Sequence, residues 1–250
     1  YFGARHFHYN LDEGIAKICQ EEGFAGCSTD IGAKAWNAKG MGTIPHALIL
    51  AYTAHMQEKN LHWIPTVETA KAFDRYIDTK IPRVVLIDTF NREIADSIET
   101  ARALPNLAGV RIDTCGENYA QGTLGWRGRL VPRLVPMLDV QEKYLTGKGV
   151  SIAAVWELRQ GLDKSGFPDL EIVISSGFNA EKTAAFMQAD REYQKFYKKQ
   201  LFNSIGTGSL AKPIMTTSDI CAYFSEKQKK WMPLSKVGRK EIPSNRLREG

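Results

Sequence analysis

The chain has 250 residues, of which 43% are hydrophobic and 24% charged, and its formal net charge is +5. This composition is typical of a globular protein with one α/β domain or two small ones. It argues against a membrane protein, because no apolar run reaches the roughly 20 residues of a membrane span and no signal-peptide pattern opens the chain. The positive charge is compatible with an anionic substrate, whereas nucleic acid is disfavoured because the basic residues form no long stripe with interleaved aromatic side chains.

Hydrophobic periodicity predicts helices and strands in alternation. Residues 11–22 have the pattern of an amphipathic helix that ends at Gly23, and residues 23–30 that of a short buried strand. Further elements are predicted as a helix over 45–59, a strand over 83–90, a helix over 91–104, a strand over 108–114, a strand over 170–177, a helix over 179–188 and a strand over 201–209. Such alternation is typical of a parallel α/β sheet or barrel.

The spacing of the four cysteines indicates the cellular compartment in which the protein resides. Cys19, Cys27, Cys115 and Cys221 are widely spaced and form no CxxC pair. A zinc site or a disulfide framework is therefore not expected, and we predict reduced thiols in a cytoplasmic protein. The chain also begins at Tyr1 without a methionine, which we interpret as a fragment or a processed product.

Polar residues follow four of the predicted strands at their ends. They are Asp88 and Thr89, Asp113 and Thr114, Ser175 to Gly177, and Gly206 to Gly208. Each group alone could form a turn or cap a helix. The carboxyl ends of parallel strands share one face, however, and active sites lie there. Together the four groups predict a site at that face.

Two of these ends are rich in small residues, in the sequences "SSGFN" and "GTGS". Small residues let backbone N–H groups approach phosphate oxygens, and a following helix adds its dipole. Neither sequence is a Walker or dinucleotide fingerprint, but two such loops indicate a phosphorylated ligand that lies across neighbouring strand ends. Asp88 and Asp113 would then suit ribose hydroxyls, a histidine partner or hydrated Mg²⁺.

The stretch "MGTIPHALIL" places His46 in the first turn of a predicted helix. Helix N-termini favour anions, so a neutral imidazole there could serve a phosphate or a sugar hydroxyl. The alternative is that Thr43 caps the helix, Pro45 takes an early helical position and His46 simply packs.

Eight short motifs occur in the order found in nicotinate phosphoribosyltransferases, and the related nicotinamide phosphoribosyltransferases share much of that order. The motifs are "YFGARHFH", "GFAGCSTDIGA", "GTIPHALIL", "VVLIDTF", "GVRIDT", "VISSGFN", "IGTGS" and "SKVGRK". The sequence resembles this family from about residue 1 to residue 246, with a variable stretch around 115–135. The resemblance implies an incomplete parallel α/β barrel of the type II phosphoribosyltransferase kind over residues 1–250, with a basic C-terminal segment 225–250 and without the family's N-terminal domain.

The resemblance also implies an activity in pyridine-nucleotide (NAD) biosynthesis. The phosphoribosyl group of phosphoribosyl pyrophosphate is transferred to nicotinate, giving nicotinate mononucleotide and pyrophosphate, with Mg²⁺. Many members couple this reaction to ATP hydrolysis through a phosphorylated histidine. The resemblance further implies a homodimer in which a second subunit, or the N-terminal domain, covers the ring site.

Site residues follow from the same motifs. Phe2 and Arg5 match the aromatic residue and the arginine that hold the pyridine ring and its substituent, in keeping with stacking and bidentate chemistry. Asp30 matches a position near that substituent, where an acid would favour the amide or would face and orient Arg5. His46 corresponds to the phosphorylatable histidine, and Asp88 to the acid that orients it.

The remaining matches concern ribose and phosphate. Arg111 and Asp113 match an Arg-x-Asp-Ser/Thr element, with Asp113 placed for the ribose hydroxyls. The two phosphate-binding turns correspond to Ser176, Gly177, Gly206, Thr207, Gly208 and Ser209. Lys236 and Arg239 could reach pyrophosphate or form a solvated basic tail. The remaining histidines (His6, His8, His55 and His62) are interpreted as structural or surface residues, and no metal ligand set is predicted.

Two alternatives stay open at this point. The acceptor could be nicotinamide or quinolinate instead of nicotinate, although quinolinate would need a more basic pocket for its two carboxylates. The chain could also be an incomplete fragment that binds phosphate without catalysis. Formation of a pyridine mononucleotide distinguishes these alternatives.

Overall fold

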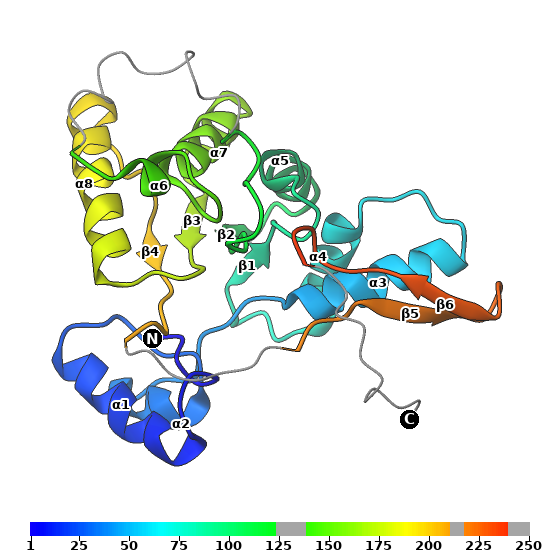
Figure 1. Cartoon of the computed structure of the whole chain (residues 1–250), viewed down its shortest axis with the longest axis horizontal. Coiled ribbons are helices and arrows are strands. Elements are labelled where there is room, and N and C mark those ends of the chain that lie inside the picture. Colours follow the sequence, from blue (N-terminus) through cyan, green and yellow to red (C-terminus); the bar gives the residue numbers. More distant parts are fainter. Residues whose placement is uncertain (124–138, 211–217, 240–250) are drawn as a thin grey trace.

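A four-stranded parallel sheet forms the centre of the computed structural model, which describes residues 1–123, 139–210 and 218–239 (Figure 1). Its strands are β1 (Arg83–Leu86), β2 (Leu107–Ile112), β3 (Glu171–Ile174) and β4 (Ser204–Ile205), and they lie in the order of the sequence. Because all pairs are parallel, the four carboxyl ends meet at one edge. The predicted fold class, α/β with a parallel sheet, is confirmed.

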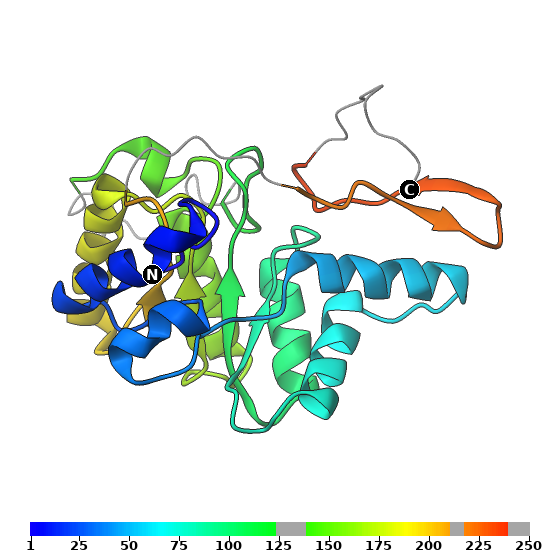
Figure 2. The same cartoon turned by 90° about the horizontal axis from the view of Figure 1, so that it is seen from below.

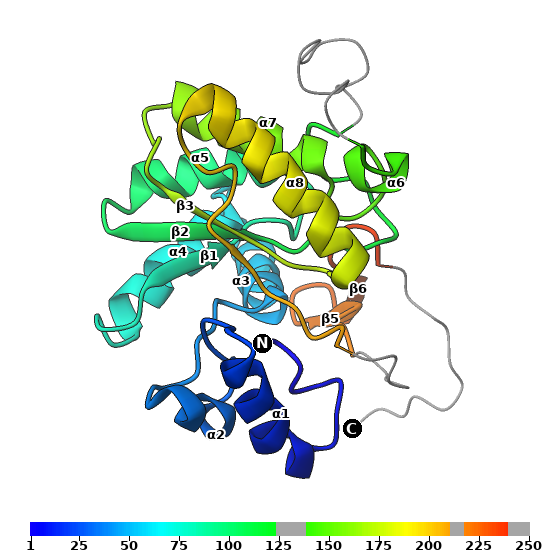
Figure 3. The same ribbon diagram turned by 90° about the vertical axis from the view of Figure 1, so that its left-hand side faces the viewer.

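The main core lies between the sheet and three helices. Figure 3 shows α5 (Glu93–Ala103), α7 (Ile152–Lys164) and α8 (Ala180–Tyr197) together on one side of the sheet. Trp156 of α7 is buried and meets the Tyr193 ring of α8 edge to face, with 4.6 Å between centroids. Each such fully buried large side chain contributes about 2 kcal/mol to folding. The short helix α6 (Glu142–Leu145) packs against α7 and α8.

A second group of helices and strands lies next to β1. Helices α3 (His46–Glu58) and α4 (Pro65–Tyr76) pack against each other, and an antiparallel hairpin of β5 (Ala222–Ser225) and β6 (Lys230–Pro233) runs beside α3 (Figure 2). The Lys227 N–H donates to Glu58 Oε2 at 3.0 Å and fixes the hairpin there. The hairpin thereby returns residues 234–239 to the sheet; residues 240–250 of the expected basic segment lie outside the described residues.

The N-terminal residues form a smaller cluster of their own. Helices α1 (Tyr9–Glu21) and α2 (Asp30–Ala33) and the 3₁₀-helix η1 (Lys34–Trp36) enclose it. Its buried apolar side chains are Tyr1, Ala16, Cys19, Cys27 and Ala33. The division of residues 1–250 into domains remains a prediction.

The predicted strand over 23–30 is wrong, because residues 23–29 belong to the loop between α1 and α2 and Asp30 begins α2. The Phe24 N–H donates to the Cys19 carbonyl and the Ser28 N–H to the Tyr1 carbonyl, so neither joins a ladder. Thr29 then caps α2 by accepting a hydrogen bond from the Gly32 N–H. The apolar pattern of this loop reflects its packing in the N-terminal cluster.

Other differences concern element boundaries. Strand 201–209 shortens to β4, and helix 179–188 extends to Tyr197 because buried residues continue at helical spacing. At the start of α3, Pro45 has extended backbone angles and is the N-cap residue, and the Thr43 side chain does not cap the helix. Among the helices of the described ranges, none is both long and apolar enough to cross a lipid bilayer.

Candidate active site

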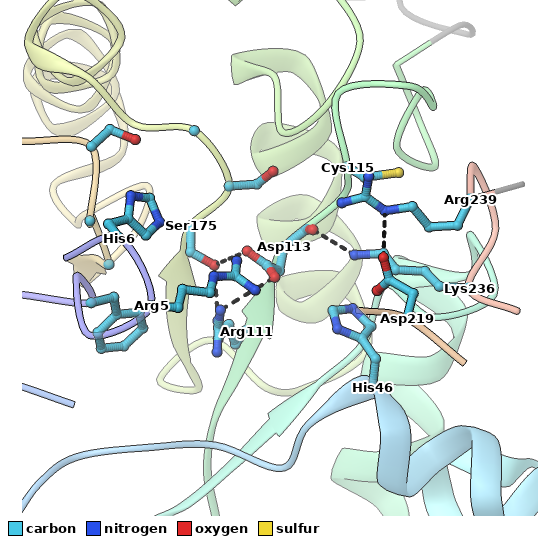
Figure 4. Close-up of a pocket in the computed structure, with 16 residues that line it drawn as sticks. Arg5, His6, His46, Arg111, Asp113, Cys115, Ser175, Asp219, Lys236 and Arg239 are labelled. Carbon is cyan, nitrogen blue, oxygen red and sulfur yellow. Dashed lines mark hydrogen bonds and ion pairs between the residues drawn. The ribbon is translucent and has the colours of Figure 1, made fainter. Parts of the chain in front are cut away.

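A cavity of about 260 Å³ opens at the carboxyl edge of the sheet (Figure 4). The predicted residues among its lining are Phe2, Arg5, His46, Arg111, Asp113, Ser176, Gly177, Gly206, Gly208 and Ser209. A second cavity of about 360 Å³ shares Phe2, Arg5, His46, Arg111 and Asp113 with it, and adds apolar side chains such as Met41, Ile44 and Leu86. The structure therefore brings most of the predicted site residues to one two-lobed cavity, with a polar lobe and a more apolar one.

Asp113 lies where the two lobes meet. Its carboxylate accepts a hydrogen bond from Ser175 Oγ at 2.6 Å and pairs with Arg111 at 3.3 Å. Arg111 in turn donates to Ser175 Oγ at 2.9 Å and to Thr43 Oγ1 at 3.1 Å. A carboxylate has about four acceptor positions, so Asp113 keeps acceptor capacity toward the cavity.

The N-terminal segment closes one wall of the cavity. The Phe2 N–H donates to the Thr207 carbonyl at 2.7 Å, and the Phe2 ring lies 5.1 Å from the Arg111 guanidinium carbon. A Cβ at Gly206 would come within 2.6 Å of the Phe2 ring, and one at Gly208 within 2.5 Å of the Phe2 carbonyl oxygen. These glycines thus admit Phe2, in addition to bordering the cavity.

His46 is held by a buried acid. His46 Nε2 lies 3.0 and 3.2 Å from the two carboxylate oxygens of Asp88, which is almost fully buried after β1. Lys236 Nζ contacts the same carboxylate. Burial would raise the pKa of Asp88, but the hydrogen bond from His46 and the Lys236 charge outweigh it and hold that pKa below its usual range. Asp88 is therefore ionised and accepts hydrogen bonds only.

The turn after β3 has an unusual backbone. Ser176 and Gly177 have φ of +79° and +65°, and a Cβ at Gly177 would meet open space, so the backbone angle is what favours glycine there. Beneath the turn, buried Lys182 Nζ donates to the Ser176 carbonyl at 2.9 Å and lies 4.3 Å from the Phe178 ring centroid. This buried lysine supports the turn from α8.

The titration of Lys182 gives a stability prediction. Burial lowers the pKa of this lysine to about 8, against about 10.4 for a solvated lysine. Between pH 8 and 10.4 the Lys182 amine is therefore protonated in the unfolded chain and neutral in the folded protein. Stability contributed by this site therefore rises with pH in that window. Between pH 7 and pH 10.5, we expect the free energy of unfolding of the wild type to rise by about 2–3 kcal/mol relative to that of Lys182→Met. Urea unfolding at both pH values measures it, and an unchanged difference would contradict a buried ammonium.

Besides Asp88, which contacts His46, two predicted residues border neither lobe. Asp30 is exposed at the start of α2, borders neither lobe, and accepts a hydrogen bond from the Gly40 N–H at 2.8 Å. The expectation that it lies near a ring substituent or faces Arg5 does not match this position. Thr207 turns its hydroxyl away from the cavity, since Oγ1 donates to the Phe178 carbonyl and accepts from the Ser209 N–H. Thr207 thus shapes the turn.

Several residues that line the cavity were not among the predicted site residues. Ser175 was noted only as a strand end, yet its hydroxyl connects Arg111 and Asp113. His6 is half-buried and lines the polar lobe, where burial and then the charge of Arg5 lower its pKa, so of the two interpretations, structural or surface, its position fits the structural one. Cys115 and Asp219 also line that lobe, and no sequence pattern marked either.

The alternative of a solvated basic tail is wrong for Lys236 and Arg239, because both line the cavity. Lys236 is 5% exposed, and Arg239 pairs with Glu117 at 3.1 Å. Within residues 1–123, 139–210 and 218–239, no three His, Cys, Asp or Glu side chains gather as a metal site would need.

The fold and site together define a mixed α/β protein with a polar cavity at the carboxyl ends of parallel strands. The chain is similar to a solved structure of nicotinate-nucleotide pyrophosphorylase from Pyrococcus furiosus, with 24% sequence identity and a TM-score of 0.54. The similarity covers 95% of this chain and 47% of that one, so the chain spans about half the length of that protein. No protein-family model matches the sequence, and no curated protein matches it. The likeness supports the fold.

Proposed function

We propose that this protein is a phosphoribosyltransferase of NAD biosynthesis that transfers the phosphoribosyl group of phosphoribosyl pyrophosphate to nicotinate. The observation that carries the proposal is the two-lobed cavity with Asp113 and Arg111 at its junction. A nucleotide has the same division, with an anionic phosphate end, a ribose in the middle and an apolar ring at the other end. The sequence resemblance and the structural likeness point in the same direction.

The polar lobe suits the phosphates. It combines the backbone of the turns at Ser176–Gly177 and Gly206–Ser209 with the guanidinium of Arg239. Asp113 would accept hydrogen bonds from the ribose hydroxyls, because its carboxylate is fixed by Ser175 and Arg111 yet borders both lobes. Mg²⁺ would enter as part of the phosphoribosyl pyrophosphate complex, as substrate.

The apolar lobe suits the pyridine ring. Phe2 offers an aromatic face, and Arg5 is exposed with no ion pair among the described residues, so its guanidinium can grip a carboxylate in bidentate fashion. Arg111 borders the same lobe but is already paired with Asp113. One available guanidinium favours nicotinate, with one carboxylate, over quinolinate, with two, and over the neutral amide.

The reaction is a displacement at the anomeric carbon. The lone pair of the pyridine nitrogen forms the bond to C1′ while the bond from C1′ to the pyrophosphate oxygen breaks, and the leaving pyrophosphate takes that electron pair. Positive charge develops on the ribose in the transition state. The carboxylate of Asp113 lies where it would stabilise that charge and align the sugar.

We extend the proposal to a cytoplasmic homodimer. Apolar side chains beside the apolar lobe and on the N-terminal helices are exposed, among them Leu11, Ile18, Ile31 and Met41. A second subunit that packs against the N-terminal helices and the apolar lobe would cover these side chains and Arg5.

The Arg5 guanidinium provides the test. Arg5→Gln should lower kcat/KM for nicotinate about 10²- to 10⁴-fold, because a hydrogen bond to a charged group contributes about 1.5–3 kcal/mol, and two are lost. The KM for phosphoribosyl pyrophosphate should change less than about twofold. The assay measures mononucleotide formation with nicotinate, nicotinamide and quinolinate in separate reactions.

Lys17→Gln is the matched control, since Lys17 is an exposed cation on α1 that borders neither lobe. It should leave all rates unchanged. If no acceptor yields a mononucleotide with the wild type, the transferase proposal fails and a phosphate-binding fragment is favoured. If the wild type prefers nicotinamide or quinolinate, and Arg5→Gln uses that acceptor as well as the wild type does, the assignment of nicotinate as the acceptor is overturned.

A further inference from the structure

The segment after the hairpin is fixed to the ends of two strands. The Val237 N–H donates to the Thr89 carbonyl at 3.0 Å, and Cys115 Sγ contacts the Val237 carbonyl at 3.6 Å. Lys236 Nζ donates to the Asp113 carbonyl at 2.8 Å and contacts the Asp88 carboxylate. This segment therefore places the ammonium group of Lys236, a residue that is buried, between the ends of β1 and β2.

Asp88 consequently has two nitrogen partners, Lys236 and His46. The Asp88 side chain is buried in contact with the Lys236 ammonium, so it is held as a carboxylate that needs one compensating positive charge. The ammonium supplies that charge. A protonated His46 would add a second positive charge beside the same carboxylate, with little water to screen it.

The other charged groups around the cavity do not need a positive charge on His46 to be balanced. Arg111 and Asp113 of β2 form an ion pair at 3.3 Å. Arg239 pairs with Glu117 at 3.1 Å and lies 3.6 Å from Asp219. Arg5 borders the cavity without an ion pair among the described residues and adds positive charge. The charges of the groups around His46 therefore sum to zero or to a net positive charge even when the imidazole is neutral.

We propose that Lys236 is a positioning residue that balances Asp88, so that His46 stays neutral, with its proton on Nε2 and a lone pair on Nδ1. Because the ionised carboxylate can only accept, it fixes the Nε2–H tautomer. Nδ1 is then able to act as a nucleophile or an acceptor. Without the ammonium, Asp88 would draw the balancing charge from His46, and Nδ1 would bind a proton more readily.

The test is a titration of His46 by nuclear magnetic resonance, with ¹⁵N-labelled histidine in the whole chain and His46→Gln to assign the signal. Wild type should show a neutral Nε2–H imidazole at pH 7. Lys236→Met should raise the His46 titration midpoint by at least one pH unit, and Lys236→Arg should restore it close to the wild-type value. Lys230→Met removes an exposed cation of the hairpin and should leave the midpoint unchanged.

An unchanged midpoint in folded Lys236→Met would overturn the inference. If that variant does not fold, the spectrum of the wild type still tests the inference. A doubly protonated His46 at pH 7, or a proton on Nδ1 alone, would overturn it. The catalytic consequence rests on the proposed function, but the spectra are recorded without substrate. The expected titration in a protein that makes no mononucleotide would therefore support Lys236's role and refute the transferase proposal.

Discussion

Replacing Asp113 with asparagine should lower kcat/KM for phosphoribosyl pyrophosphate by about 10²- to 10³-fold, the usual effect of removing one charge aimed at a developing transition-state charge. The carboxylate sits at the junction of the two lobes and is held by Ser175 at 2.6 Å and Arg111 at 3.3 Å. Asparagine keeps the shape and one carbonyl acceptor but loses the charge that faces the ribose. Steady-state mononucleotide formation measures the change.

Asp169→Asn is the matched control, because this exposed acid precedes β3 at the opposite end of the strand from Ser175. It should retain wild-type kinetics. Circular dichroism should show Asp113→Asn folded. Wild-type turnover in folded Asp113→Asn would refute the assignment of Asp113 to the ribose.

The central strands could be predicted because burial on both faces leaves a continuous apolar run. Such runs precede Asp88, Asp113 and Ser175, and each became a strand. Helix α7 and the β5–β6 hairpin were missed for opposite reasons. Helix α7 is buried around most of its circumference, which weakens the amphipathic pattern, while the hairpin is short and mostly exposed.

The site could be predicted in part because topology alone brings parallel strand ends to one edge. That rule placed Asp88, Asp113 and both turns correctly near the cavity. It could not place Lys236, whose position depends on a hairpin that returns the chain from α3. Nor could it show that Asp30 would bond the Gly40 N–H, because a sequence does not display such loop contacts.

His46 carries the prediction with the most distinctive chemistry. Incubation with ATP should give an acid-labile, base-stable phosphoryl adduct on this residue. The Nδ1 lone pair would form a bond to the γ-phosphorus while the bond from that phosphorus to the β,γ-bridging oxygen breaks, and ADP leaves with the electron pair. The geometry favours Nδ1, because Nε2 donates to Asp88 at 3.0 Å. The N-terminus of α3 tolerates the added negative charge.

His46→Ala should abolish the adduct and lower ATP-independent synthesis by about 10²-fold or less, because alignment of the two substrates does not require the imidazole. His55→Ala is the control, since His55 is exposed on the same helix and should keep both adduct and rate. If ATP neither labels the wild type nor changes its rate, ATP coupling fails while the transferase proposal stands. If His46→Ala unfolds the protein but leaves the folded fraction fully active, His46 serves packing alone, because an imidazole that meets phosphate or ribose cannot be removed without a cost in rate.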